Sequence, residues 1–114
     1  WNDSILMEPH VHIFHGFSTQ HTMFNVQTRK TITSKDSINR QCVGESIIKY
    51  QDQILRFGGW DLTNKKATDA FYCGTMSTSS MNQDIAWQQQ YHRTLPVAVF
   101  GCGRIIYQHR LIVF

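Results

Sequence analysis

The sequence predicts an all-β protein made of repeated antiparallel four-stranded units. Short apolar runs rich in β-branched and aromatic residues alternate with polar turn residues, which is typical of strands joined as hairpins. One of these runs, Gln53–Phe57, ends on the pair Gly58-Gly59, and related runs end at Phe14 and Phe114. The three phenylalanines are 43 and 57 residues apart. Self-similarity at such intervals indicates a repeat architecture, and the strand character favours a β-propeller.

The first unit is predicted to span residues 1–43. Apolar runs at 4–8 and 11–17 predict its opening hairpin, with Gly16 near the end of the second strand. A polar loop follows, and then come a third strand around 22–26 and a fourth around 30–33. A glycine at a strand end allows a sharp turn and close approach of neighbouring backbone.

The second unit is predicted to span residues 44–100. Its hairpin combines the runs 44–51 and 53–57 through a tight polar corner. A polar loop is expected at 60–68, a third strand at 69–73 and a fourth at 85–89. The Ser/Thr/Met-rich stretch at 74–82 is interpreted as an insertion between the last two strands.

The third unit, residues 101–114, is predicted to be a truncated first hairpin. It aligns with the second unit without gaps, so that Tyr50 matches Tyr107 and Phe57 matches Phe114. The chain begins without methionine and stops where the next glycine pair is due. Because propellers typically contain four to eight blades, we expect a fragment with about two and a half repeats.

This pattern resembles the kelch family of β-propellers, and the resemblance covers nearly the whole chain. In that family each blade is an antiparallel four-stranded sheet whose second strand ends in two glycines, with an aromatic in the third strand and a tryptophan in the fourth. The residues that match this repeat signature are Gly16, Gly58, Gly59, Phe71 and Trp87. The first unit departs from the pattern, because His15 replaces its first glycine and Thr31 stands near the tryptophan position.

The resemblance implies a non-catalytic module that binds a protein partner through loops at one face of the propeller. The residues expected to bind the partner are Trp60, Lys65, Lys66, His92 and Arg93. Exposed aromatic and basic side chains on loops are effective interface anchors. In the alternative interpretation Trp60 caps the blade edge and the lysines only keep the loop soluble. Two other functions stay open: part of a propeller enzyme of the galactose-oxidase-like type, or a structural or cytoskeletal scaffold.

No catalytic constellation is visible in the sequence. Ser77–Ser80 lack the Gly-x-Ser-x-Gly frame of a nucleophile elbow. Asp61, Asp69 and Asp84 are isolated in sequence and fit turn or strand-edge positions. We therefore expect no enzymatic activity, no cofactor and no small-molecule substrate.

A histidine-rich strand is the best metal candidate. His10 and His12 would point to one face of a strand, with His15 and His21 nearby. No cysteine or carboxylate is spaced to complete a tetrahedral set, and the segment aligns with ordinary strands of the other units. We therefore expect no metal site.

Net charge, the length of the apolar runs and the cysteines indicate which class of partner and which compartment to expect. The net charge of +3 is small and the basic residues are scattered, which argues against nucleic acid. No apolar run approaches the roughly 18 residues of a membrane helix. Three cysteines without close pairing predict free thiols in a cytoplasmic protein. The expected partner is thus a protein, whose identity the sequence leaves open.

Overall fold

The computed structural model describes residues 2–35, 38, 41–76 and 85–114. Within these ranges the chain forms β1 to β13 and no helix, which confirms the predicted all-β fold. It follows that no helix able to cross a membrane occurs in the described residues. The serine cluster at 77–80 lies outside them.

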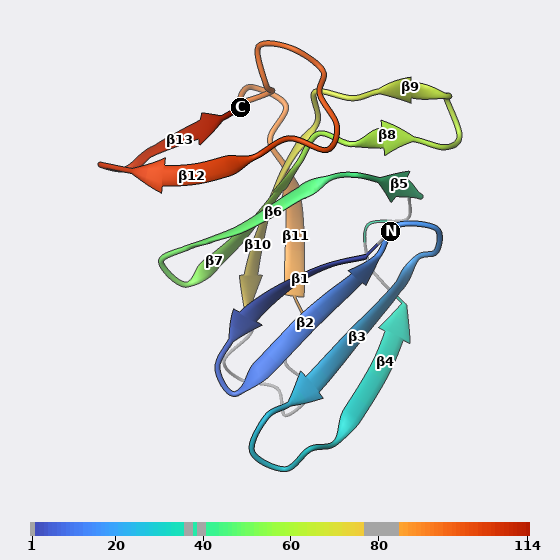
Figure 1. Ribbon diagram of the computed structural model, residues 1–114, viewed down its shortest axis with the longest axis vertical. Helices are drawn as coiled ribbons and strands as arrows, with labels where there is room; N and C mark the ends of the chain where they lie inside the picture. Colours follow the sequence, from blue (N-terminus) through green and yellow to red (C-terminus); the bar gives the residue numbers. More distant parts are fainter. Residues whose placement is uncertain (1, 36–37, 39–40, 77–84) are drawn as a thin grey trace.

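The first sheet contains four strands in chain order, each antiparallel to the next (Figure 1). They are β1 (Asn2–Met7), β2 (His10–His15), β3 (Gln20–Asn25) and β4 (Thr31–Lys35). Asn25 shapes the turn after β3, because its Oδ1 accepts hydrogen bonds from the backbone N–H groups of Gln27 and Thr28 at 2.9 and 3.0 Å. The sheet lies within the range predicted for the first unit.

The second sheet repeats this plan, again with each strand antiparallel to the next. Its strands are β6 (Ser46–Tyr50), β7 (Gln53–Phe57), β10 (Phe71–Met76) and β11 (Ile85–Gln89). The corner between β6 and β7 is tight, and Gln51 takes a positive φ of 55° there. The predicted four-stranded antiparallel sheet therefore occurs twice.

A two-stranded sheet follows, made of β12 (Arg104–Tyr107) and β13 (Arg110–Val113). Gln108 and His109 form its corner, with φ of 48° and 61°. Positive φ at both central residues is the requirement of a type I′ hairpin turn. The corner occupies the position that the alignment of the two segments predicts, although only Gln51 has a positive φ in the corner between β6 and β7.

The segment 60–68, expected to be a loop, instead contains a short hairpin. Its strands β8 (Trp60–Asp61) and β9 (Lys66–Ala67) extend a small sheet that starts with β5 (Cys42–Val43). Asp61 organises the turn, because its Oδ1 accepts hydrogen bonds from the backbone N–H groups of Thr63 and Asn64 at 2.8 and 3.1 Å. An aspartate that bonds the backbone two and three residues on stabilises a turn that composition alone does not distinguish from a loop.

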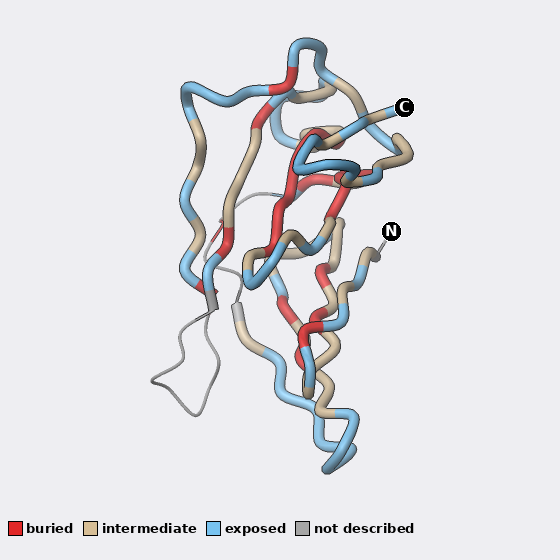
Figure 2. The backbone as a smooth tube through the Cα atoms, turned by 90° about the vertical axis from the view of Figure 1, so that its left-hand side faces the viewer, coloured by how far each residue is buried: buried red, intermediate tan, exposed pale blue. Residues whose placement is uncertain are grey.

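Two apolar cores lie between successive sheets. The first core joins Met7 and Phe14 of the first sheet to Ile47, Ile54 and Ile85 of the second. Buried backbone accordingly runs through the middle of the molecule in Figure 2. The sheets therefore pack face to face along the chain.

The second core covers the opposite face of the second sheet. Leu55 and Phe57 are buried there, and Ile106, Leu111 and Val113 of the third hairpin pack against them. The second sheet is thus apolar on both faces, which explains why β7 reads as an almost continuous apolar run.

The three aligned phenylalanines lie near the end of β2, at the end of β7 and directly after β13. Phe14 and Phe57 are 3% and 0% exposed, because the following unit covers each of them. Phe114 is 76% exposed, and no described unit follows it. The aligned phenylalanine is therefore buried in a unit that has another unit packed over it.

The first strands of the three units, β1, β6 and β12, lie next to one another (Figure 1). Arg104 links them, because its Nη2 donates to Asp3 Oδ2 at 2.8 Å and its Nε donates to the Ile47 carbonyl at 3.1 Å. Ser46 Oγ also donates to the Cys102 carbonyl at 3.2 Å. The described sheets do not close into a ring, so closure as a propeller stays a prediction.

The paired glycines have the backbone role that the sequence predicts for them. Gly58 and Gly59 adopt φ of 66° and 105°, and their N–H groups donate to the carbonyls of Ala70 at 3.0 Å and Val99 at 2.7 Å. Gly16 lies in the turn after β2 and is not among the residues with positive φ. The turn after β2 therefore forms without the left-handed glycine conformation that follows β7.

Candidate functional site

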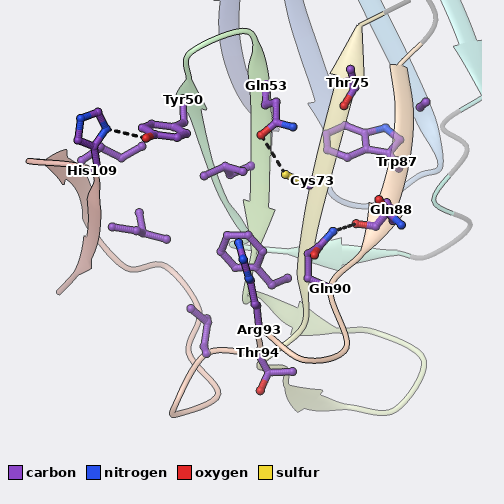
Figure 3. A pocket seen from close by; sticks show the side chains of 16 residues that line it. Tyr50, Gln53, Cys73, Thr75, Trp87, Gln88, Gln90, Arg93, Thr94 and His109 are labelled. Atoms are coloured by element: carbon purple, nitrogen blue, oxygen red, sulfur yellow. Dashed lines mark hydrogen bonds between the residues drawn. The ribbon is translucent and has the colours of Figure 1, made fainter.

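A groove of about 820 Å³ opens between the second sheet and the third hairpin (Figure 3). Leu55 and Phe71 line it from the second sheet, while Ile106 and Leu111 line it from the hairpin. These apolar side chains belong to the second core, which the groove interrupts. A concave apolar surface of this size suits a small ligand or a peptide segment.

Polar side chains surround this apolar surface. Gln53, Gln88 and Gln90 supply amide groups, and Arg93 supplies a guanidinium group. The Gln90 amide nitrogen donates to the Gln88 carbonyl at 3.5 Å. The described residues that line the groove include Arg93 and His109 but no carboxylate. The groove therefore favours a neutral or acidic ligand.

A hydrogen bond of 2.7 Å joins Tyr50 Oη to His109 Nδ1 across one end of the groove. Their rings also meet edge to face, with centroids 6.0 Å apart. Tyr50 ends β6 beside the corner of one hairpin and His109 lies in the corner of the equivalent hairpin, so packing of the two units brings them together. The contact fixes the distance between the hairpin corners at this end.

Cys73 is the one thiol in the groove. Its Sγ donates to Gln53 Oε1 at 3.5 Å. Burial raises the pKa of the Cys73 thiol, and the nearby Arg93 guanidinium only partly opposes that rise. The thiol therefore stays protonated at neutral pH and is a weak nucleophile.

The five residues predicted to bind a partner lie on two separate segments. Trp60, Lys65 and Lys66 belong to the β8–β9 hairpin, whereas His92 and Arg93 belong to the turn after β11. All but Trp60 are exposed. Arg93 lines the groove, and the lining does not include the other four.

Trp60 is half-buried and packs edge to face on Phe100, with ring centroids 5.5 Å apart. Phe100 belongs to the segment that connects β11 to β12, so this contact anchors the β8–β9 hairpin to it. The interpretation that Trp60 caps the blade edge agrees with this packing. Part of the Trp60 ring still remains accessible.

His10 and His12 lie on one face of the histidine-rich strand β2, as predicted, with ring centroids 6.2 Å apart. His12 Nδ1 lies 2.9 Å from His21 Nε2 on the neighbouring strand, and the two rings stack. His15 instead bonds the Thr22 hydroxyl at 2.9 Å. No group of three or more metal-ligating side chains occurs among the described residues.

We expect acid to destabilise the fold through His12. Burial, together with the charges of His21 and His10, lowers the pKa of His12 from 6.5 to about 4. The stability that neutral His12 contributes is therefore fully present above pH 6.5. It declines as the pH falls from 6.5 to 4, by about 3 kcal/mol in total. Urea denaturation of wild type and His12→Asn across this pH range measures the free energy of unfolding. The variant should lose less stability than wild type as the pH falls. An equal loss in both proteins would contradict the role assigned to His12.

A buried ion pair between Glu45 and Arg56 was not predicted from the sequence. Arg56 Nε donates to Glu45 Oε1 at 2.9 Å, and its Nη2 contacts the same oxygen. The guanidinium carbon lies 4.4 Å from the Phe14 ring centroid and 4.9 Å from that of Trp87. The pair thus lies where the first sheet meets the second.

No family model matches the chain, and a search of curated proteins finds no relative.

Proposed function

We propose that the chain is a non-catalytic protein-interaction module built from kelch-type β-propeller blades. Three observations support the blade assignment: the repeated four-stranded meander, the adjacent first strands and the aligned phenylalanines. A further unit packed against β12 and β13 would cover Phe114 as Phe57 is covered now.

The β8–β9 hairpin is the surface that we propose binds the partner. It projects to one side of the second sheet, away from β12 and β13 (Figure 1). Lys65 and Lys66 are exposed beside its turn, and Lys65 takes a φ of 55°. The Trp60–Phe100 contact holds the base of the hairpin. A partly accessible tryptophan beside two lysines suits a protein surface that offers carboxylates around an apolar centre.

The state of the cysteines supports a cytoplasmic compartment. Cys42, Cys73 and Cys102 form no disulfide with one another. Free thiols are typical of the reducing cytoplasm, so we propose that the module works there.

Charge reversal at the hairpin tests the function. The variant Lys65→Glu/Lys66→Glu should lose partners that the wild-type chain captures by cross-linking in an extract of its own cells. The matched control Lys30→Glu/Lys49→Glu makes the same charge change at exposed positions outside the hairpin and should retain them. Loss of the same partners in both variants, or in neither, would refute the assignment of this hairpin.

A further inference from the structure

Two buried imidazole nitrogens in the first sheet have no hydrogen-bond partner among the described residues. They are His10 Nδ1 and His12 Nε2, on side chains that share one face of β2. The His12 side chain is fully buried, and buried polar atoms in folded proteins are nearly always paired. Two unpaired nitrogens on neighbouring side chains therefore fit a ligand that both of them contact.

The contact between His12 and His21 sets the direction of the unpaired His12 nitrogen. His12 Nδ1 lies 2.9 Å from His21 Nε2, and the two nitrogens of an imidazole ring point in nearly opposite directions. His12 Nε2 is therefore directed away from His21. His21 stands opposite Phe14 in the pairing of β2 with β3, so His10 is the neighbour of His12 on the other side.

The same contact prepares His12 to bind a metal. When His12 Nδ1 donates its proton to His21, the free electron pair is on His12 Nε2, where a metal requires it. Metal-binding histidines typically donate their other ring N–H to a neighbouring group in this way, which fixes the orientation of the ring.

The His10 and His12 rings are spaced as two ligands of one metal ion. Their centroids lie 6.2 Å apart, and the ring planes differ by 53°. Metal–nitrogen bonds of about 2 Å to two imidazoles on opposite sides of an ion place the ring centroids about 6 Å apart. The two rings therefore need little movement to hold one ion between them.

Met23 supplies a third ligand from the neighbouring strand. It is buried and stands directly opposite His12 in the pairing of β2 with β3, so the two side chains share a face. Its side chain is long and flexible enough to bring the thioether to the histidine pair. Met7 stands opposite His10 in the same way but packs into the first apolar core. Because Met23 lies on another strand, the spacing of residues along β2 gives no signal for it.

The ligand types select the metal. Among the described residues no third histidine, cysteine or carboxylate completes a metal-binding group with His10 and His12, so the usual ligands of a tetrahedral zinc site are not assembled. Thioether and imidazole both bind copper, and thioethers favour its soft Cu(I) state, which accepts two or three ligands. Cu(II) instead prefers four nitrogen or oxygen ligands in a plane.

We propose that His10, His12 and Met23 bind a cuprous ion on the face of the first sheet that packs toward the second. The ligands are His10 Nδ1, His12 Nε2 and the thioether sulfur of Met23, and His21 orients the His12 ring. The ion would join β2 to β3 beside Phe14, a residue of the first core. This site is separate from the β8–β9 hairpin and does not depend on the function proposed for that hairpin.

Methyl NMR of the wild-type chain tests the thioether ligand directly. The chain contains four methionines, so labelling with [methyl-¹³C]methionine gives one methyl resonance for each, and Met23→Leu and Met7→Leu assign two of them. Cu(I) is diamagnetic and is added without oxygen as its acetonitrile complex. The Met23 resonance should shift to saturation, whereas the Met7 resonance should move little. Copper that binds only to the cysteine thiols would leave the Met23 resonance in place.

Competition with bicinchoninate, whose Cu(I) complex is coloured, measures the affinity. His10→Asn and Met23→Leu should each weaken Cu(I) binding about tenfold or more. The matched controls His15→Asn and Met7→Leu remove a histidine and a methionine from the same sheet and should leave the affinity unchanged. Far-UV circular dichroism shows that each variant is folded before its affinity is compared with that of wild type.

Three outcomes would overturn the proposal. The first is a Met23 resonance that Cu(I) does not move. The second is equal Cu(I) affinity of wild type, His10→Asn and Met23→Leu. The third is a shift of the Met23 resonance by Zn(II) at the same concentrations as by Cu(I), since this would assign the site to a different class of metal.

Discussion

Gly59→Val should destabilise the protein by about 3–5 kcal/mol, counting the cost of positive φ together with that of steric overlap. Gly59 has a φ of 105°, which side-chain-bearing residues rarely adopt. A Cβ there would also collide with Cys42 Sγ and approach Glu45 Cβ to 3.0 Å. Urea denaturation followed by far-UV circular dichroism measures the change.

The repeat supplies a matched control for this substitution. Gly16 ends the corresponding strand of the first unit and is not among the residues with positive φ. Gly16→Val should therefore cost about 1 kcal/mol or less, and Lys65→Ala, at an exposed position, about 0.5 kcal/mol or less. Equal losses for Gly59→Val and Gly16→Val would contradict the role assigned to the glycine pair.

Glu45→Ala should be comparably damaging, at about 3–5 kcal/mol, because it leaves the Arg56 guanidinium buried without its carboxylate. Both side chains are only 6% exposed, so water cannot replace the lost partner. Phe14 and Trp87 also lie against the guanidinium group, and displacing it would disturb the contact between the first two sheets. Chemical denaturation measures the loss.

A double-mutant cycle separates the ion pair from its surroundings. Glu45→Leu/Arg56→Met replaces both charges with apolar side chains. It should recover most of the stability lost in the single variants Glu45→Leu and Arg56→Met. A double variant as unstable as the sum of the two single variants would show that the residues contribute independently, which contradicts the pairing.

Local chemistry explains why the hairpins were predictable. Alternating apolar residues around Gln51 and Gln108 mark two strands and their turn, and the structure places hairpin corners at both. The β8–β9 hairpin was missed because its strands are two residues long. Its turn depends on hydrogen bonds of the Asp61 side chain rather than on apolar periodicity.

The buried polar pairs were not predictable, because they depend on how the strands are paired and how the sheets pack. Arg56 is the one charged residue of β7, and a charged side chain in a strand is ordinarily expected to face solvent. It is buried because the first sheet covers that face. His12 meets His21 through the pairing of β2 with β3, so the sequence could name His15 and His21 as neighbours of His12 but could not tell which of them bonds it.

The most direct test of the stacked repeat units is the solvent exposure of the three aligned phenylalanines. Labelling the chain with fluorophenylalanine gives a ¹⁹F spectrum of seven phenylalanines, in which single Phe→Leu variants assign Phe14, Phe57 and Phe114. A soluble paramagnetic chelate should broaden the Phe114 resonance strongly and leave the Phe14 and Phe57 resonances sharp. Broadening of Phe14 or Phe57 to the same extent as Phe114 would contradict the packing of each unit on the one before it.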